Sequence, residues 1–223
     1  MFFRKIYKFA GEKCIAMKRG IHIMLVFFLL VVSCPLPLWP GMQNTRLYQE
    51  EVNCAFTNAV CQDADGFVWM GTDYGLYRFD GVDFKCYLHD ESDSASLSDN
   101  MVRCLYMDRS GRLWVGTANG LQYYCPQSDN FRPVPIHGVS GVGGFVTCIT
   151  QRRKTGEVWF IASGIGMFRV EGHEAVQVKS SPACLKPYLN VLCEDASGNL
   201  WVGTDRAGVY RVGANAVSYT HLR

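Results

Sequence analysis

The 223-residue sequence lacks the motifs that mark common classes of enzyme and metal site. It has no Cys-x-x-Cys pair and no Gly-x-Ser-x-Gly, and no phosphate-loop lysine follows the glycine-rich residues 141–144. Its five histidines never occur in pairs, so none has the spacing of a zinc site. Asp63 and Asp65 begin like a calcium loop, but no glutamate stands at its twelfth position. The sequence therefore predicts no catalytic residue, no metal and no cofactor in this chain.

A strongly basic region is also missing from most of the chain. The net charge is +2, but residues 1–40 hold six basic residues and one acidic residue. Residues 41–223 therefore hold the other 16 basic and 19 acidic residues, a net charge of −3. A mildly acidic body without a basic stripe excludes nucleic acid as a partner of this segment. Hydrophobic residues make up 48% of the sequence, which is typical of a folded chain.

The apolar stretch from Ile21 to Val32 is too short for an ordinary membrane-spanning helix, which needs roughly 20 residues. Six cations precede it, and this order is the pattern of a secretory signal. Residues 1–40 are thus predicted to be a signal peptide or leader and the remainder to be exported. An uncleaved anchor or a core helix is the alternative. Residues 31–34 also resemble a lipobox, which leaves lipidation at Cys34 open.

A repeat of about 44 residues organises the exported part. Four tryptophans are separated by 45, 45 and 42 residues, namely Trp69, Trp114, Trp159 and Trp201. Three of them lie in the pattern D-x-x-G-x-[VL]-W-x-G-T, followed by Gly and an apolar residue, in residues 63–77, 108–123 and 195–210. The copy around Trp159 is degraded, with Arg153 in place of the aspartate. Repeats of this length are typical of propellers and other repeat folds.

Each repeat predicts four short strands with tight turns between them. In the second copy these strands are expected over residues 102–107, 113–117, 121–124 and 131–134. Pro133 suits an outer edge strand, where its missing N–H is not needed. The tryptophan is expected to pack between neighbouring sheets, where Gly71, Gly116 and Gly203 permit close approach. The predicted fold is all-β: a partial β-propeller of about four four-stranded blades after an N-terminal signal segment.

The repeat also sets the expected domain boundaries. These are the leader at 1–40, blade 1 with its lead-in at 41–96, blade 2 at 97–140, blade 3 at 141–183, an incomplete blade 4 at 184–216 and a tail at 217–223. The tail does not fit the repeat and is interpreted as non-native, with at most a short outer strand in 214–218. Cys61, Cys104, Cys148 and Cys193 fall at equivalent repeat positions in pairs, which favours small buried strand residues over a metal or redox site.

The W-x-G-T-x-x-G-L pattern after a D-x-x-G turn resembles the two-component regulator propeller repeat, over residues 52–212. The resemblance implies the periplasmic sensor region of a hybrid two-component histidine kinase of Bacteroidetes, and a chain that is its N-terminal fragment. It implies further blades, a β-sandwich, a membrane span and kinase domains downstream, and a homodimeric, inner-membrane receptor. The usual ligands of such sensors are oligosaccharides, and their output is transcription for polysaccharide utilisation.

Four residues are candidates for contacting such a ligand. Asp73, Tyr74, Asn119 and Arg206 each lie on the short turn between the second and third strands of a blade. Propeller loops converge on one face, which offers a rigid concave site. Ordinary turn chemistry is the alternative for each of them, so the ligand-binding residues stay unassigned.

Two other classes of protein compete with the sensor. Sialidase propellers carry an Asp-box, but Asp63, Asp108 and Asp195 stand three residues before glycine, where that motif has two. A scaffold propeller that binds protein partners would need no further domain. The complete gene distinguishes the three classes, because it holds kinase domains, catalytic carboxylates or neither.

Overall fold

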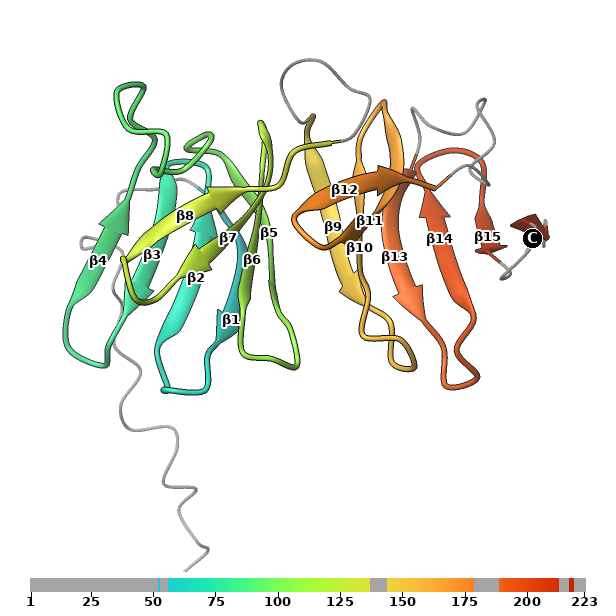
Figure 1. Ribbon diagram of the computed structural model, residues 1–223, viewed down its shortest axis with the longest axis horizontal. Helices are drawn as coiled ribbons and strands as arrows, with labels where there is room; N and C mark the ends of the chain where they lie inside the picture. Colours follow the sequence, from blue (N-terminus) through green and yellow to red (C-terminus); the bar gives the residue numbers. More distant parts are fainter. Residues whose placement is uncertain (1–51, 53–55, 137–143, 179–188, 213–216, 219–223) are drawn as a thin grey trace, which may run out of the picture. The chain divides into compact units, whose positions relative to one another are not determined.

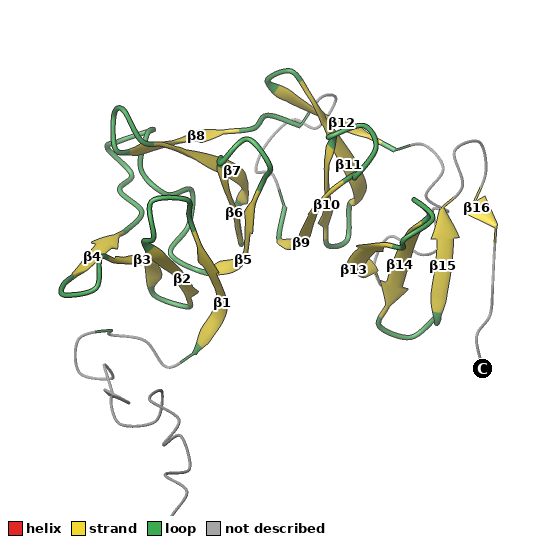
Figure 2. Ribbon diagram, turned by 90° about the horizontal axis from the view of Figure 1, so that it is seen from below, coloured by secondary structure: helices red, strands yellow, loops and turns green. Residues whose placement is uncertain are grey.

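The computed structural model describes residues 52, 56–136, 144–178, 189–212 and 217–218, all within the unit Tyr48–Arg223. The predicted leader, 1–40, lies outside the described residues. Every regular element in the described part is a β-strand, as Figures 1 and 2 show. No helix in this part has the length and hydropathy that a membrane crossing requires.

The strands form four antiparallel sheets, which we call blades 1 to 4. Blade 1 consists of β1 (Thr57–Gln62), β2 (Val68–Thr72), β3 (Gly75–Phe79) and β4 (Phe84–Tyr87). Blade 2 consists of β5 (Val102–Met107), β6 (Leu113–Thr117), β7 (Gly120–Cys125) and β8 (Asn130–Pro133). Blade 3 consists of β9 (Val146–Gln151), β10 (Val158–Ala162), β11 (Gly166–Glu171) and β12 (Glu174–Gln177). Blade 4 consists of β13 (Leu189–Glu194), β14 (Leu200–Thr204), β15 (Val209–Val212) and β16 (Val217–Ser218).

Each sheet is a meander in which strands pair in sequence order. This arrangement confirms the predicted partial propeller of four-stranded blades. In blade 2 the first two strands have the predicted bounds, and the other two differ from prediction by a single residue at each end. Pro133 ends the outer strand β8, as expected for a residue without an N–H. The two-residue β16 lies within the short outer strand expected over 214–218, and the remaining tail, 219–223, lies outside the described residues.

The first turn of each intact repeat is built around its aspartate, and we call it the Asp turn. In blade 1, Oδ1 of Asp63 accepts hydrogen bonds from the backbone N–H groups of Asp65 and Phe67 at 3.1 and 2.9 Å. Its Oδ2 accepts the indole N–H of Trp69 at 2.7 Å. The equivalent indole bonds, Trp114 to Asp108 and Trp201 to Asp195, are both 2.8 Å long. One carboxylate therefore shapes the turn and also holds the tryptophan six residues later.

The opposite end of each sheet carries the turn between its second and third strands, which we call the Thr turn. In blade 1, the hydroxyl of Thr72 donates to the carbonyl of Gly75 at 2.9 Å and accepts the N–H of Tyr74 at 3.0 Å. Thr117 makes the same two bonds in blade 2, to Gly120 and from Asn119. The threonine of the repeat is thus a buried turn-former.

The tryptophans pack between successive blades, as the repeat predicts. Trp69, Trp114 and Trp159 are 1%, 3% and 8% exposed, and each belongs to the apolar cluster that its blade shares with the next one. Two residues after the tryptophan, only a glycine leaves room for this packing. A Cβ on Gly71 would lie 2.6 Å from Val102 Cγ1 of β5, and one on Gly116 would lie 2.8 Å from Val146 Cγ1 of β9. Successive inner strands therefore approach closely beside each tryptophan.

Blade 4 differs from the others because the described chain supplies no sheet after it. Trp201 is only half-buried, although its indole keeps the bond to Asp195. Cys193 is exposed, which corrects the prediction that it is a small buried residue. Cys61, Cys104 and Cys148 lie on inner strands and are half-buried. The prediction was wrong at Cys193 because equivalent positions in a repeat are equally buried only when both neighbouring blades are present.

Candidate ligand-binding surfaces at the two ends of the blades

All four residues predicted as ligand contacts lie at Thr turns, but the side chains of two of them form hydrogen bonds within the protein. Oδ1 of Asp73 accepts the N–H of Phe56 at 3.1 Å. Nδ2 of Asn119 donates to the carbonyl of Ser98 at 3.1 Å. Both bonds tie the Thr turn to a segment 17 or 21 residues earlier in the chain, so each side chain already has a partner within the fold.

The other two candidates present their side chains to solvent. Tyr74 is 59% exposed, and Arg206 is also exposed. They belong to the Thr turns of blades 1 and 4, and no described contact joins them. Only these two of the four candidates therefore have side chains available to a ligand.

Tyr74 lies among other exposed apolar side chains that the sequence did not single out. Phe56, Leu88 and Met101 are 70%, 53% and 39% exposed, and with Tyr74 we call them the Tyr74 patch. The hydrogen bonds of Asp73 with Phe56 hold that residue beside the turn. Exposed apolar groups gathered at one loop end are typical of binding surfaces.

The two remaining members of the patch are placed by Gly75. Its N–H donates to the carbonyl of Asn100, next to Met101, at 2.7 Å. Leu88 Cδ2 lies 2.8 Å from the position that a Cβ on Gly75 would take. Sequence reasoning missed these residues because they stand outside the repeat motif and approach the turn only in the folded chain.

The loop that carries Leu88 and Met101 is fixed by one buried amide. Gln122 is 2% exposed, and its Nε2 donates to the carbonyl of Ser96 at 3.1 Å. Its Oε1 accepts the N–H of Ser98 at 2.8 Å. A buried side chain with both ends satisfied holds the loop in one conformation, so the Tyr74 patch rests on a rigid support.

A polar cluster joins the outer strands of blades 1 and 2. Asp129, at φ 52°, accepts the hydroxyls of Tyr87 and Tyr124 at 2.7 and 2.5 Å and pairs with Lys85. Burial alone would raise the pKa of Asp129, but the hydrogen bonds from Lys85 and the two tyrosines outweigh it and lower the pKa to about 2. The cluster therefore connects blades 1 and 2 through hydrogen bonds and an ion pair.

The thiols show no sign of chemical activation. All six cysteines that the structure describes are free. Burial, with a smaller contribution from Asp63, raises the pKa of Cys61 to about 11. Burial also raises the pKa of Cys104 and of Cys148. These thiols are therefore protonated at neutral pH. In the described ranges, no three His, Cys, Asp or Glu side chains gather as a metal site would require.

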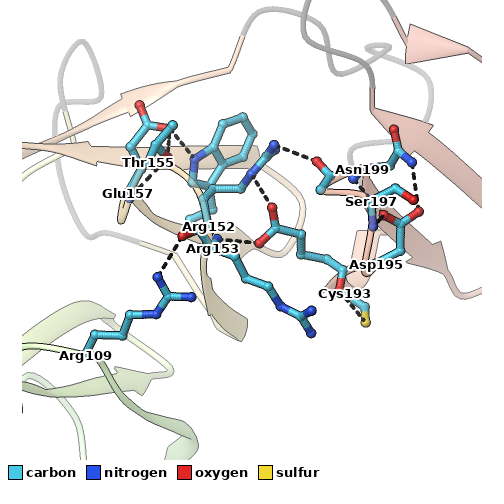
Figure 3. Close-up of polar contacts among 12 residues, drawn as sticks. Arg109, Arg152, Arg153, Thr155, Glu157, Cys193, Asp195, Ser197 and Asn199 are labelled. Carbon is cyan, nitrogen blue, oxygen red and sulfur yellow. Dashed lines mark hydrogen bonds and ion pairs between the residues drawn. The ribbon is translucent and has the colours of Figure 1, made fainter.

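At the opposite end, the Asp turn of blade 3 lacks its aspartate; Glu157 of the same turn accepts the Trp159 indole at 3.4 Å, and blade 4 supplies a second carboxylate. The backbone N–H of Arg153 donates to Oε2 of Glu194 at 2.5 Å. Oε1 of Glu194 pairs with Nε of Arg152 at 3.3 Å. Figure 3 shows Arg152 directed toward the turn that carries Ser197 and Asn199. A buried ion pair between blades thus maintains the turn where the repeat is degraded.

The four sheets and their repeat define this chain as part of a β-propeller. The model of the family described as two component regulator propeller matches residues 51–74, 96–119 and 186–206. Each match ends at or within the Thr turn of an intact copy. Three segments of this chain therefore match the two-component regulator propeller repeat.

A curated relative extends this similarity beyond the motif. The chain is 32% identical over 170 residues to Histidine kinase P4 of Formosa agariphila, across 71% of this chain. The chain spans about an eighth of that relative, since the match covers 12% of its length.

Solved structures agree on the fold. The extracellular domains of two B. thetaiotaomicron proteins described as hybrid two-component systems superpose with TM-scores of 0.68 and 0.62. The first is 22% identical, and the match covers 78% of this chain and 26% of that domain's chain. The second is 21% identical, and the match covers 73% of this chain and 24% of that domain's chain. Virginiamycin B lyase from Staphylococcus aureus also superposes, at 12% identity and a TM-score of 0.56, over 74% of this chain and 55% of its own. A fold shared with a lyase does not define a function.

Proposed function

We propose that this chain is the ligand-sensing propeller region of a hybrid two-component histidine kinase, exposed in the periplasm. The observation that carries the proposal is the 32% identity to a histidine kinase across 71% of the chain. The cationic leader followed by an apolar stretch supports export, and the family repeat supports a sensor role. Kinase and membrane-spanning segments would then follow in the parent protein, which would be anchored in the inner membrane as a homodimer.

The proposed ligand is an oligosaccharide, and the proposed output is transcription for polysaccharide utilisation. The Tyr74 patch supports this ligand class, because exposed aromatic rings on a rigid support suit the apolar faces of sugars. Phe56 and Tyr74 would supply ring faces. Binding transmits a signal only if the ligand favours one of two receptor states, so the patch would have to contact parts of the receptor that move relative to blade 1.

Two measurements test this function. The first is the sequence of the complete gene, which should encode a membrane span and a histidine kinase domain after the propeller. A gene without both would replace the sensor proposal with a scaffold propeller that binds protein partners.

The second measurement is calorimetric titration of the complete receptor with a panel of oligosaccharides of different composition. Tyr74→Ala should weaken binding by about tenfold, since aromatic contacts typically contribute 0.5–1.5 kcal/mol beyond buried area. Val82→Ala is the matched control, because Val82 is also exposed, at 71%, but lies at the opposite end of blade 1. Equal affinities for both variants and the parent protein would exclude the Tyr74 patch as the site.

A further inference from the structure

A group of exposed cations lies at the Asp turns of blades 2 and 3, at the end of the sheets opposite the Tyr74 patch. Its members, which we call the cationic surface, are Arg109, Arg112, Arg153 and Lys154. Arg109 joins the two turns, because its guanidinium donates to the carbonyl of Arg153 at 2.7 Å and its N–H donates to Gln151 Oε1 at 3.0 Å. Figure 3 shows Arg109 reaching from blade 2 toward Arg153.

The other two cations are placed by contacts of their own. The Arg112 guanidinium lies 4.7 Å from the ring centroid of Tyr123 and 5.6 Å from that of Trp114. The side chain of Lys154 lies over the blade 4 turn, with Cε 3.4 Å from the position that a Cβ on Gly198 would take. The four charges therefore come from two adjacent turns and are partly ordered before any ligand binds.

The charges of the cationic surface are not neutralised nearby. Within the described ranges, none of the four side chains lies at ion-pair distance from a carboxylate. Nearby acids are already engaged: Asp108 is buried and accepts four hydrogen bonds, Glu194 is buried against Arg152, and Glu157 of the blade 3 turn pairs with Arg169 at 3.9 Å. The surface therefore carries a local excess of positive charge on an otherwise acidic body.

The fold does not require these cations. Arg109 corresponds to Ala64 and Ala196 in the Asp turns of blades 1 and 4. Arg112 corresponds to Phe67 and Asn199 in the same turns. These blades form the same turn without a cation at either position. Blade structure thus explains the aspartates, glycines and tryptophans but leaves the charges unexplained.

Arg153 is a further cation that the fold does not require, because it stands where the intact copies of the repeat have an aspartate. The substitution removes the carboxylate that shapes the other three turns, and two glutamates take over parts of its role: Glu194 of the next blade accepts the N–H of Arg153, and Glu157 of the same turn accepts the Trp159 indole at 3.4 Å. A second cation, Lys154, follows immediately. The turn therefore carries two adjacent cations where the intact copies begin with an aspartate.

We infer that the cationic surface binds the sulfate or carboxylate groups of an anionic oligosaccharide. Planar guanidinium groups pair with such anions through two parallel hydrogen bonds, and three of the four cations are arginines. The sugar class rests on the proposed function, to which the inference adds a second sugar-contacting surface, opposite the Tyr74 patch, for acidic groups. A membrane surface is less well matched, because no large exposed apolar side chain of the described chain lies in these two turns.

The test titrates the full chain with a sulfated dextran oligosaccharide, an oligogalacturonate and neutral dextran of equal length. The two acidic probes should bind and the neutral probe should not. Arg109→Gln combined with Arg153→Gln should weaken acidic binding about tenfold, and added salt should weaken it further. The matched control is Arg103→Gln with Arg132→Gln, which removes two exposed charges outside the cationic surface and should leave the affinity unchanged. Circular dichroism of each variant confirms that the strands are intact.

Several results would overturn the inference. These are equal weakening by the control variant, equal binding of neutral dextran, and binding of phosphatidylglycerol vesicles or poly-glutamate without binding of the acidic sugars. The complete gene and its kinase test the receptor function separately. Loss of acidic binding therefore leaves that function intact, and absence of a kinase leaves the anion titration valid.

Discussion

Asp108 offers the most direct test of how the repeat stabilises a blade. Its carboxylate accepts the N–H and hydroxyl of Ser110 at 2.8 and 2.6 Å, the N–H of Arg112 at 3.0 Å and the indole of Trp114 at 2.8 Å. In Asp108→Ala the turn amides lose their hydrogen bonds to the carboxylate but are exposed to water. This loss should cost about 1 kcal/mol, as for a lost helix cap. The buried indole would be left without an acceptor at a cost of about 2–3 kcal/mol. The expected loss for blade 2 is therefore roughly 3–4 kcal/mol.

Hydrogen exchange measured on residues 113–117 and on blade 1 gives this local free energy, which a global melt would average over blades. Asp108→Asn should lose less stability than Asp108→Ala, since its amide oxygen still accepts the hydrogen bonds that one carboxylate oxygen accepted. Asp65→Ala is the matched control, because Asp65 is an exposed aspartate in the equivalent turn whose side chain makes no described hydrogen bond. A loss below about 1 kcal/mol in Asp108→Ala, or one equal to that of the control, would refute the role given to the carboxylate.

Three further predictions follow from the same contacts. Gly116→Ala should destabilise the contact between blades 2 and 3 by about 1–3 kcal/mol, because its Cβ would lie 2.8 Å from Val146 Cγ1 of β9; an unchanged urea midpoint would contradict this. Stability should fall as the pH drops from about 4 toward 2, because folding lowers the pKa of Asp108 and of Asp129, and protonation of each carboxylate removes its contribution to stability. Urea midpoints at pH 5 and pH 3 test this. Asp129→Asn should reduce the difference between the two midpoints. The chain alone should turn over neither glycans nor ATP, and reproducible turnover abolished by one point mutation would show otherwise.

The parts of the fold that recur were accessible from the sequence. Asp, Gly and Trp at fixed spacing predicted turns, strands and the packing of Trp114 between sheets, because each blade solves the same steric problem. The hydrogen bond from Trp114 to Asp108 was not predicted, although the constant six-residue separation in three copies was a usable signal. Local repetition therefore reports local structure reliably.

Contacts between blades were not accessible in the same way. The bond from Arg153 to Glu194 and the cluster around Asp129 join residues more than 40 positions apart, and neither belongs to the repeat. The Tyr74 patch has the same character, since Phe56 and Leu88 approach the Thr turn only after folding. A single sequence reveals the residues that all copies of the repeat share, whereas a binding surface depends on residues that occur in one copy only.

The central claim, that this propeller senses a ligand for a kinase, is tested most directly by autophosphorylation of the complete receptor in membranes. Oligosaccharides that bind should change the rate of phosphate incorporation, and Tyr74→Ala should shift the response to higher concentration while leaving the rate without ligand unchanged. A complete receptor whose phosphorylation is the same with and without every oligosaccharide that binds it would contradict the account.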